Sequence, residues 1–384
     1  MKDPWPSLVQ RLKRMNARRV DVTHVECQGH RWLYFGGCDY LGMSANRRVQ
    51  KAFSETGAQT LHQTSASRVT TGDHDVFAEL EKALASFMGR SSACLFGSGY
   101  LAPLGVAQSL RDEVTRVLID EKAHSALAEA ALLSHLPIER YEHGNVEALK
   151  CLLNKHVPSD VPLVMTDGVW AHDGSVSDVS AILSLLPKQG YLLVDDSHGV
   201  GVVGRHGQGA SDVAGRRDSR LLVAFSLSKA FGLGGGVVVG GRRMMDRLKT
   251  LSGAYSGSTP TPLPVASALL VATHCVARMT TARARFRKRF SDFERKVEVS
   301  PKAVQPQAAT SFRAPIYRLK PDSRECGLRL FECLRQEGIF PPLIQYPAGT
   351  AEAYFRFSVS LRHTRADLDR LARAILNART DSDM

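Results

Sequence analysis

The 384-residue sequence contains no run of about 18 uncharged apolar residues, and we therefore predict no membrane span. It also contains no C-x-x-C pair. Its seven cysteines are scattered and odd in number, which argues against a disulfide framework or a zinc ribbon, and we expect no metal site and a reducing, cytoplasmic location. Repeats of fixed period and low-complexity segments are absent too. With 43% hydrophobic and 23% charged residues, the composition excludes a mainly disordered, collagen-like or coiled-coil chain.

Positive charge is in excess, at +12, which favours anionic partners such as nucleic acids, acidic lipids or phosphorylated and CoA-bearing small molecules. One stretch, 278–296, concentrates this charge, and we predict that it forms an exposed amphipathic helix with a solvated basic face. Its basic residues include Arg278, Arg283, Arg285, Arg287, Lys288 and Arg289. The chain has no helix-turn-helix, zinc or RNP signature, so we expect no nucleic-acid partner.

Apolar runs alternate with helical patterns through the middle of the chain, which predicts an α/β fold with a mostly parallel sheet. A composition break at 256–264 and a long predicted helix over 265–297 precede a shorter α+β pattern. We therefore expect an N-terminal arm with a helix and a hairpin (1–45), a large α/β domain (46–255) and a smaller C-terminal domain with its connecting helix (256–384). The predicted strands are 114–120, 136–141, 161–167, 190–196, 221–227 and 235–240.

Polar residues follow two of these predicted strands, at the sheet edge where ligands of α/β proteins bind. Asp195 lies at the end of the predicted strand 190–196 and His198 follows that strand, whereas Lys229 follows the strand at 221–227. Taken singly, the three fit a strand-end cap, a hydrogen-bonded histidine and an ordinary helix-start lysine. Together they fit pyridoxal phosphate chemistry, in which a lysine forms a Schiff base and a carboxylate keeps the pyridine nitrogen protonated.

A glycine-containing segment, LFGSGYLAP (95–103), follows another apolar run and opens a helical pattern. Backbone N–H groups at such a helix start can face a phosphate, and Ser226 and the Ser258–Thr259 pair offer hydroxyl groups. A lone glycine loop is weak evidence by itself.

Several motifs together make the chain resemble the α-oxoamine synthase family of fold-type-I pyridoxal phosphate enzymes, and within it the 8-amino-7-oxononanoate synthases. The resemblance runs from about residue 30 to the C-terminus and implies a homodimer with the active site at the subunit interface. Its most specific motifs are VDDSHGVGVVGRHGQG (194–209) and SLSKAFG (226–232), supported by DYLGMS (39–44), DEKAHSAL (120–127), TDGVWAHDG (166–174) and FRFSVSLRHT (355–364).

The resemblance implies a role for each matching residue. Lys229 would form the Schiff base and move the Cα proton, Asp195 would pair with the pyridinium nitrogen, and His198 would bond the ring's phenolic oxygen. His124 would stack on the ring, and Arg356 would hold the amino-acid carboxylate. The remaining implied cofactor contacts are Ser98, Gly99, Tyr100, Ser226 and, from the other subunit, Thr259. The implied reaction condenses an amino acid with an acyl-CoA thioester, with decarboxylation, to an α-amino ketone.

Three departures from the family pattern affect the substrate side. Cys38 stands where an asparagine normally helps to hold the substrate carboxylate, and a thiol is a poor hydrogen-bond partner. The usual Gly-Ser-Gly-Gly-Ser-Arg loop is replaced by Gln63–Arg68, which removes backbone freedom. Ala171 replaces a serine that normally lies close to the cofactor. These changes weaken biotin synthesis as the specific assignment.

Other functions stay open at this stage. The chain could be another fold-type-I enzyme, such as an aminotransferase, or a synthase that takes its acyl group from a carrier-protein thioester. A nucleic-acid-binding protein using 278–296 and a catalytically inactive relative are less favoured alternatives, the latter because both Lys229 and Asp195 are present.

Overall fold

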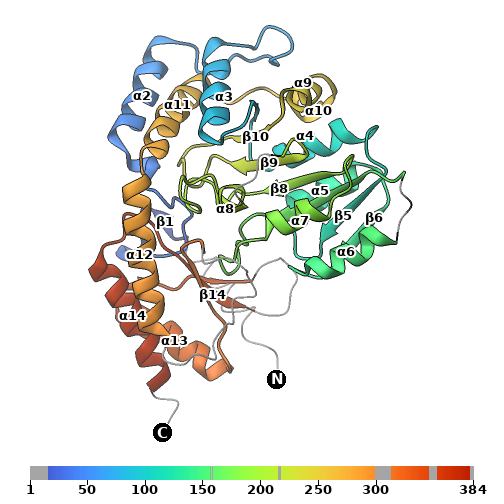
Figure 1. The fold of residues 1–384 in the computed structure, drawn as a ribbon. Coiled ribbons are helices and arrows are strands. Elements are labelled where there is room, and N and C mark those ends of the chain that lie inside the picture. The colour runs from blue at the N-terminus through green and yellow to red at the C-terminus, as the bar shows by residue number, and fades with distance from the viewer. Residues whose placement is uncertain are drawn as a thin grey trace.

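The computed structural model describes residues 16–155, 157, 159–214, 218–298, 313–345 and 353–380. At its centre is a seven-stranded sheet in the order β4-β10-β9-β8-β7-β5-β6 (Figure 1). All six strands predicted from the apolar runs lie in it. The strands are β4 (Ser92–Phe96), β5 (Arg116–Asp120), β6 (Ile138–Tyr141), β7 (Pro162–Asp167), β8 (Tyr191–Asp195), β9 (Leu221–Ser226) and β10 (Gly236–Gly240).

The sheet is parallel from β6 to β9, and β10 alone runs in the opposite direction, antiparallel to both β9 and β4. Six strands therefore point the same way, and five of them, all but β6, end beside the candidate site described below. This confirms the predicted α/β fold with a mostly parallel sheet.

Both faces of the sheet are buried, because alternate side chains of each strand enter two separate apolar cores. In β8, Leu192 and Val194 belong to one core, whereas Leu193 belongs to the other. This explains why the strands are continuous apolar runs in the sequence. The core that contains Leu193 is covered by α4 (Leu101–Leu110), α5 (Ser125–Leu133), α9 (Arg242–Leu251) and α10 (Gly253–Ser256). The core that contains Leu192 and Val194 is covered by α2 (Arg47–Gln59), α3 (Asp75–Phe87), α6 (Val146–Asn154), α7 (Val179–Leu185), α8 (Ala210–Ala214) and α11 (Leu263–Ala277).

The long helix predicted over 265–297 is wrong in one respect: it is two helices. α11 is followed by α12 (Thr280–Val297), with a bend of 72° between them. Neither of these helices, nor any other single helix among the described residues, is long and apolar enough to cross a membrane, and only this bent pair passes that test jointly, by length and composition.

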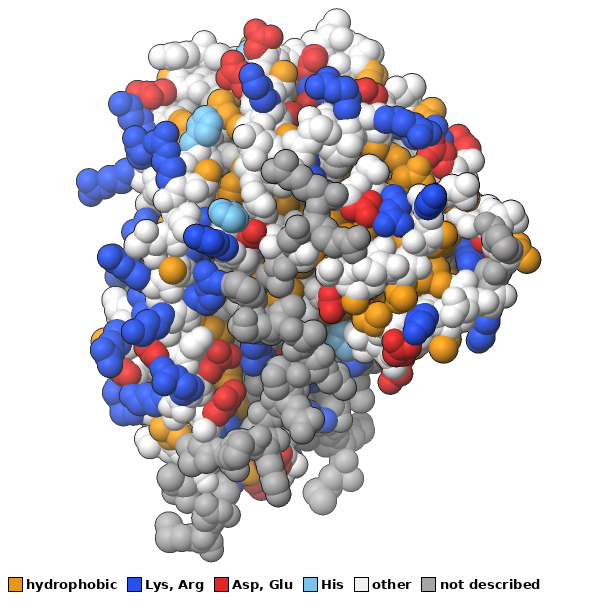
Figure 2. Space-filling view, viewed as in Figure 1, with side chains coloured by type: hydrophobic (Ala, Val, Ile, Leu, Met, Phe, Trp, Pro, Cys, Tyr) orange, Lys and Arg blue, Asp and Glu red, His pale blue; other side chains and the backbone are white. Residues whose placement is uncertain are grey.

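The prediction that the whole basic cluster of α12 is exposed is also wrong for Arg283. Its side chain is 1% exposed and donates hydrogen bonds to the carbonyl oxygens of Gly201 (3.1 Å), Val276 (3.2 Å) and His206 (2.9 Å). Arg285 and Lys288 are exposed, as expected, and basic side chains line the edge of the molecule where α12 lies (Figure 2). Burial of Arg283 thus ties α12 to the loop that follows β8.

Two smaller sheets accompany the central one, and in one of them strands from both ends of the chain pair. The hairpin expected in the arm is present, and its strand β3 pairs with β12 in the sheet β1-β2-β3-β12. Apart from the 3-10 turn η1 (Met43–Ala45), residues 16–46 contain no helix, and residues 1–15 lie outside the described part of the chain. The remaining elements are β1 (Arg18–Arg19), β2 (His24–Cys27), β3 (His30–Tyr34), β11 (Ile316–Leu319), α13 (Arg324–Gln336), β12 (Ile339–Phe340), β13 (Leu343–Ile344), β14 (Tyr354–Ser358) and α14 (Arg365–Thr380).

Candidate active site

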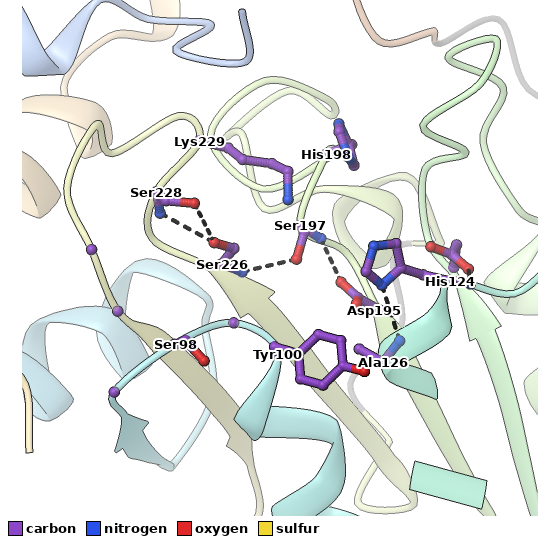
Figure 3. Close-up of a pocket in the computed structure, with 15 residues that line it drawn as sticks. Ser98, Tyr100, His124, Ala126, Asp195, Ser197, His198, Ser226, Ser228 and Lys229 are labelled. Atoms are coloured by element: carbon purple, nitrogen blue, oxygen red, sulfur yellow. Dashed lines mark hydrogen bonds between the residues drawn. The ribbon is translucent and has the colours of Figure 1, made fainter. Parts of the chain in front are cut away.

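A cavity of about 320 Å³ lies at the carboxyl ends of the parallel strands. Eight of the residues singled out from the sequence line it (Figure 3). They are Ser98, Gly99, Tyr100, His124, Asp195, His198, Ser226 and Lys229. They come from four separate segments of the chain, and the shared direction of the strands brings them together.

Lys229 follows β9 in a turn, and its side chain extends into the cavity toward His198 and the end of β8 (Figure 3). Beside it, the hydroxyl groups of Ser226 and Ser228 lie 2.7 Å apart, and the backbone N–H of Ser228 donates to Ser226 Oγ at 3.2 Å. The Ser226 N–H in turn donates to Ser197 Oγ at 2.9 Å. This hydrogen-bonded group fixes the turn that presents the lysine.

Asp195 is the last residue of β8 and is 5% exposed. One of its carboxylate oxygens accepts the backbone N–H of Ser197 at 3.1 Å, which holds the side chain at the cavity floor. A buried carboxylate is costly unless it is paired, so this position favours a cationic or N–H-bearing group in the cavity.

His124 forms the N-cap of α5 and faces the cavity from β5's end of the sheet. The backbone N–H of Ala126 donates to His124 Nδ1 at 3.2 Å, so in the neutral ring the proton resides on Nε2. Burial lowers the pKa of His124, and the nearby charge of Asp195 partly offsets this effect. His124 is therefore a neutral, flat ring at neutral pH.

His198 is 8% exposed and, like His124, lines the cavity. Burial, together with the positive charges of Lys229 and Arg356, holds its pKa well below the usual range. The Tyr40 hydroxyl lies 2.7 Å from His198 Nδ1, and Tyr40 is itself 1% exposed. Tyr40 therefore orients a neutral imidazole whose other nitrogen is available to the cavity.

Asp167 and Ser197 are among the lining residues that were not singled out from the sequence. Asp167 ends β7 next to Asp195, and its Oδ2 accepts the backbone N–H of His124 at 2.9 Å. Burial and the adjacent Asp195 raise its pKa well above the usual range. The signal that could have revealed it is its position, because Asp167 ends the predicted strand 161–167 just as Asp195 lies at the end of the next one.

Three residues expected in the site do not line this cavity: Thr259, Arg356 and Cys38. The Thr259 carbonyl oxygen lies beside Gly97, 3.7 Å from where a side chain on that glycine would begin. Arg356 reaches the loop after β7 and donates through Nη1 to the Ala171 carbonyl oxygen at 3.3 Å. Cys38 is half-buried and close enough to Tyr40 to raise the pKa of that hydroxyl further, although burial is the main cause.

The loop in which the sequence lacks the expected glycines, Gln63–Arg68, is held by specific contacts. Ser65 adopts a left-handed backbone conformation, with φ of 54°, that glycine normally occupies. Ser67 Oγ donates to the Ser256 carbonyl oxygen at 2.6 Å, and Arg68 Nη1 donates to the buried Glu81 at 2.6 Å. The first bond connects the loop to the segment that carries Thr259, and the second connects it to α3.

Asp196, the second aspartate of the motif, points away from the cavity and is fully buried. One oxygen accepts the Ala210 N–H at 2.7 Å and the other has no hydrogen-bond partner; burial, the largest cause, raises its pKa to about 7. A side chain on Gly199 or Gly209 would begin only 2.0 or 1.9 Å from its oxygens. Asp196 thus anchors the glycine-rich loop 199–209.

This raised pKa predicts a pH dependence of stability. Between the ordinary value of 3.8 and about 7, the folded protein binds a proton on Asp196 that the unfolded chain does not, so this contribution to the free energy of unfolding increases as pH falls through 7. Urea unfolding at pH 5 to 8 should show wild type gaining stability relative to Asp196→Asn toward pH 5, by about 1 kcal/mol per pH unit. A pH-independent difference between the two proteins would contradict it.

Comparison with known proteins identifies the family. The model of the family "Aminotransferase class I and II" matches residues 31–375. The chain belongs to this family. It is 31% identical over 369 residues to an 8-amino-7-oxononanoate synthase of Methylobacillus flagellatus, covering 94% of this chain and 91% of that protein. It is 36% identical over 356 residues to the enzyme of the same name from Cronobacter sakazakii, covering 91% of this chain and 89% of that protein.

Solved structures of α-oxoamine synthases, the branch of the aminotransferase class I and II family to which this chain belongs, share its fold. A serine palmitoyltransferase of Sphingomonas wittichii superposes with a TM-score of 0.86 at 21% identity, covering 99% of this chain and 98% of that one. An 8-amino-7-oxononanoate synthase from Francisella tularensis gives a TM-score of 0.76 at 22% identity, over 92% and 99% of the chains.

Enzymes of this branch use pyridoxal phosphate, and the cavity suits that cofactor. A side chain on Gly99 would begin 2.5 Å from Ser226 Cβ, so glycine is needed for the Ser98–Tyr100 segment to pack directly against Ser226, which brings the two candidate phosphate-binding segments together. Asp195 provides the buried anion that a protonated ring nitrogen requires, and Lys229 provides the amine. The residues present therefore fit the cofactor predicted from the sequence.

Proposed function

We propose that the protein is a pyridoxal phosphate-dependent acyltransferase of the α-oxoamine synthase type. It would condense an amino acid with an acyl thioester and release carbon dioxide and a thiol, leaving an α-amino ketone. One observation carries this proposal: Lys229, Asp195, His198 and His124 surround a single cavity in a chain whose curated relatives, matched over about nine-tenths of its length, are named 8-amino-7-oxononanoate synthases.

Bound pyridoxal phosphate would supply an aldehyde that takes up an amine and a protonated ring that accepts the electron pair of the broken bond. Around it, Asp195 holds the proton at the ring nitrogen, and the flat, neutral ring of His124 stacks on the cofactor. His198, oriented by Tyr40, donates a hydrogen bond through Nε2 to the phenolic oxygen. Ser226 and the Ser98–Tyr100 segment hold the phosphate at the start of α4.

Lys229 would have two tasks in this arrangement. Its Nζ would hold the cofactor covalently, and its amine, when free, would remove the proton from the Cα atom of the amino acid and later return one. Arg356 would bind the α-carboxylate of the amino acid and so orient its Cα atom for proton removal by Lys229.

We further propose a homodimer in which Thr259 of one subunit reaches the cofactor phosphate bound to the other. The position of Thr259 beside Gly97, yet outside the lining of the cavity, supports this, because a second subunit could approach that edge. A cytoplasmic location is proposed on the seven free cysteines, since oxidising compartments favour disulfides.

Thiol release tests the reaction. Protein supplied with pyridoxal phosphate would be given glycine, alanine, serine, aspartate or glutamate against a panel of acyl-CoA and acyl carrier-protein thioesters. Release that requires both an amino acid and a thioester supports the synthase, and the better thioester identifies the acyl carrier. Conversion of the cofactor to its amine form by an amino acid, without any thiol release, would instead establish an aminotransferase.

A further inference from the structure

One face of the small sheet β11-β14-β13 carries polar side chains. Alternation along β14 puts Tyr354, Arg356 and Ser358 on the same face, and the β11–β14 register places Arg318 directly opposite Arg356. This face adjoins the candidate active site, because Arg356 contacts the Ala171 carbonyl oxygen after β7 and its charge lowers the pKa of His198.

Four buried polar atoms on this face have no hydrogen-bond partner. They are Arg318 Nε, Tyr354 OH, Arg356 Nε and Ser358 Oγ. Tyr354 is 3% exposed and Ser358 is 1% exposed. Buried polar groups in proteins are nearly always hydrogen-bonded, so four such atoms on one sheet face indicate a surface built to bind a polar ligand.

The charges on this face are also unbalanced. Like charges directly opposite each other on paired strands destabilise a sheet, yet Arg318 and Arg356 occupy such positions. The Arg318 guanidinium packs on the Tyr354 ring at 4.6 Å from its centroid, and neither arginine forms an ion pair with any carboxylate in the described part of the chain. An anion between the two guanidinium groups would remove the repulsion.

The neighbouring loop after β7 adds little negative charge. Burial, with the charges of His143, Arg318 and Lys122, lowers the pKa of His172 to about 4, so its ring is neutral at pH 7. Asp173, a carboxylate in this loop, lies 3.4 Å from His172 Nε2 and accepts hydrogen bonds from the N–H and hydroxyl of Ser175, and the nearby Asp120 is paired with His143 at 3.0 Å. The surroundings of Arg318 are therefore cationic overall.

We propose that Arg318 and Tyr354 bind a second carboxylate, carried by the side chain of the amino-acid substrate. This rests on the proposed function, in which Arg356 binds the α-carboxylate of the same molecule. Opposed residues of an antiparallel pair have Cβ atoms about 4.5–5.5 Å apart, a spacing that suits the two carboxylates of a short acidic amino acid. The guanidinium group of each arginine can grip a carboxylate with two parallel hydrogen bonds.

Calorimetric titration with succinate and with propionate tests this binding site without any reaction. Succinate, which carries two carboxylates, should bind the wild-type protein at least about tenfold more tightly than propionate does. Arg318→Gln should abolish that preference, whereas Arg285→Gln, which removes an exposed arginine of α12, should keep it. Equal affinity for the two acids in wild type, or an unchanged preference in Arg318→Gln, would overturn the proposal.

The thiol-release reaction separates this proposal from the proposed function. With a neutral acyl thioester, aspartate or glutamate should give a higher kcat/KM than alanine, and Arg318→Gln should reverse the order by raising KM for the acidic substrate. An unchanged kcat/KM for aspartate and glutamate in Arg318→Gln overturns the inference while the synthase function stands. An effect of Arg318→Gln confined to acyl thioesters with a free carboxylate also overturns it, because the second carboxylate then belongs to the acyl donor. If no amino acid releases thiol, the proposed synthase function is wrong. The titrations with succinate and propionate then decide by themselves whether Arg318 and Tyr354 bind a second carboxylate.

Discussion

Lys229→Ala should reduce the rate of thiol release by about 10²–10⁴-fold, the range that a positioned general base contributes. The variant should also lose the borohydride-reducible bond to the cofactor, since Lys229 is the lysine whose side chain extends into the cavity among the residues that line it. Mass spectrometry of reduced, digested protein locates that bond in wild type.

Lys82→Ala is the matched control, because Lys82 is an exposed lysine of α3 and should retain both the rate and the reducible bond. A borohydride-reducible cofactor bond that persists in Lys229→Ala would show that another amine holds the cofactor. A normal rate without the bond would remove Lys229 from the proton transfer.

Asp195→Asn should lower kcat by about 10²–10³-fold, the cost of losing one buried electrostatic contact to the reacting group. The amide keeps the size of the side chain but cannot hold a proton on the ring nitrogen, so electron acceptance by the cofactor weakens. The absorbance spectrum of the bound cofactor and its dependence on pH should change as well, which a merely structural role would not produce.

Asp195→Glu, which retains the charge, should keep more of the activity than Asp195→Asn does. Asp292→Asn, at an exposed position of α12, should leave activity and spectrum unaltered. An Asp195→Asn enzyme with wild-type kcat and an unshifted spectrum would refute the assignment of Asp195 to the ring nitrogen.

Much of the fold and many of the candidate cofactor-binding residues could be predicted, because the strands and the points where they end are visible in the sequence. Apolar runs buried on two faces are visible in the sequence, and polar residues such as Asp195 and Lys229 that interrupt them mark the edge where parallel strands finish. His124 and Gly99 required the family resemblance, because a helix-start histidine or a single glycine has many ordinary explanations.

The substrate side could not be predicted in the same way. The pairing of Arg318 with Arg356 depends on the register between β11 and β14, strands about 40 residues apart in sequence, and no local pattern fixes that register. Burial of Arg283 was missed for a related reason: its partners are backbone carbonyl groups of a distant loop, to which a basic run in the sequence gives no clue.

The bonds of Arg283 have a mechanical consequence. They join α12 to α11 through the Val276 carbonyl oxygen and to the loop after His198 through the carbonyl oxygens of Gly201 and His206. These hydrogen bonds therefore fix the 72° bend between the two helices, which is a rigid bend and not a hinge. If a bound substrate draws the sheet that carries Arg318 and Arg356 inward, the movement must come from another part of the chain. The bonds of Arg283 hold α12 and the loop beside His198 in a fixed relative position.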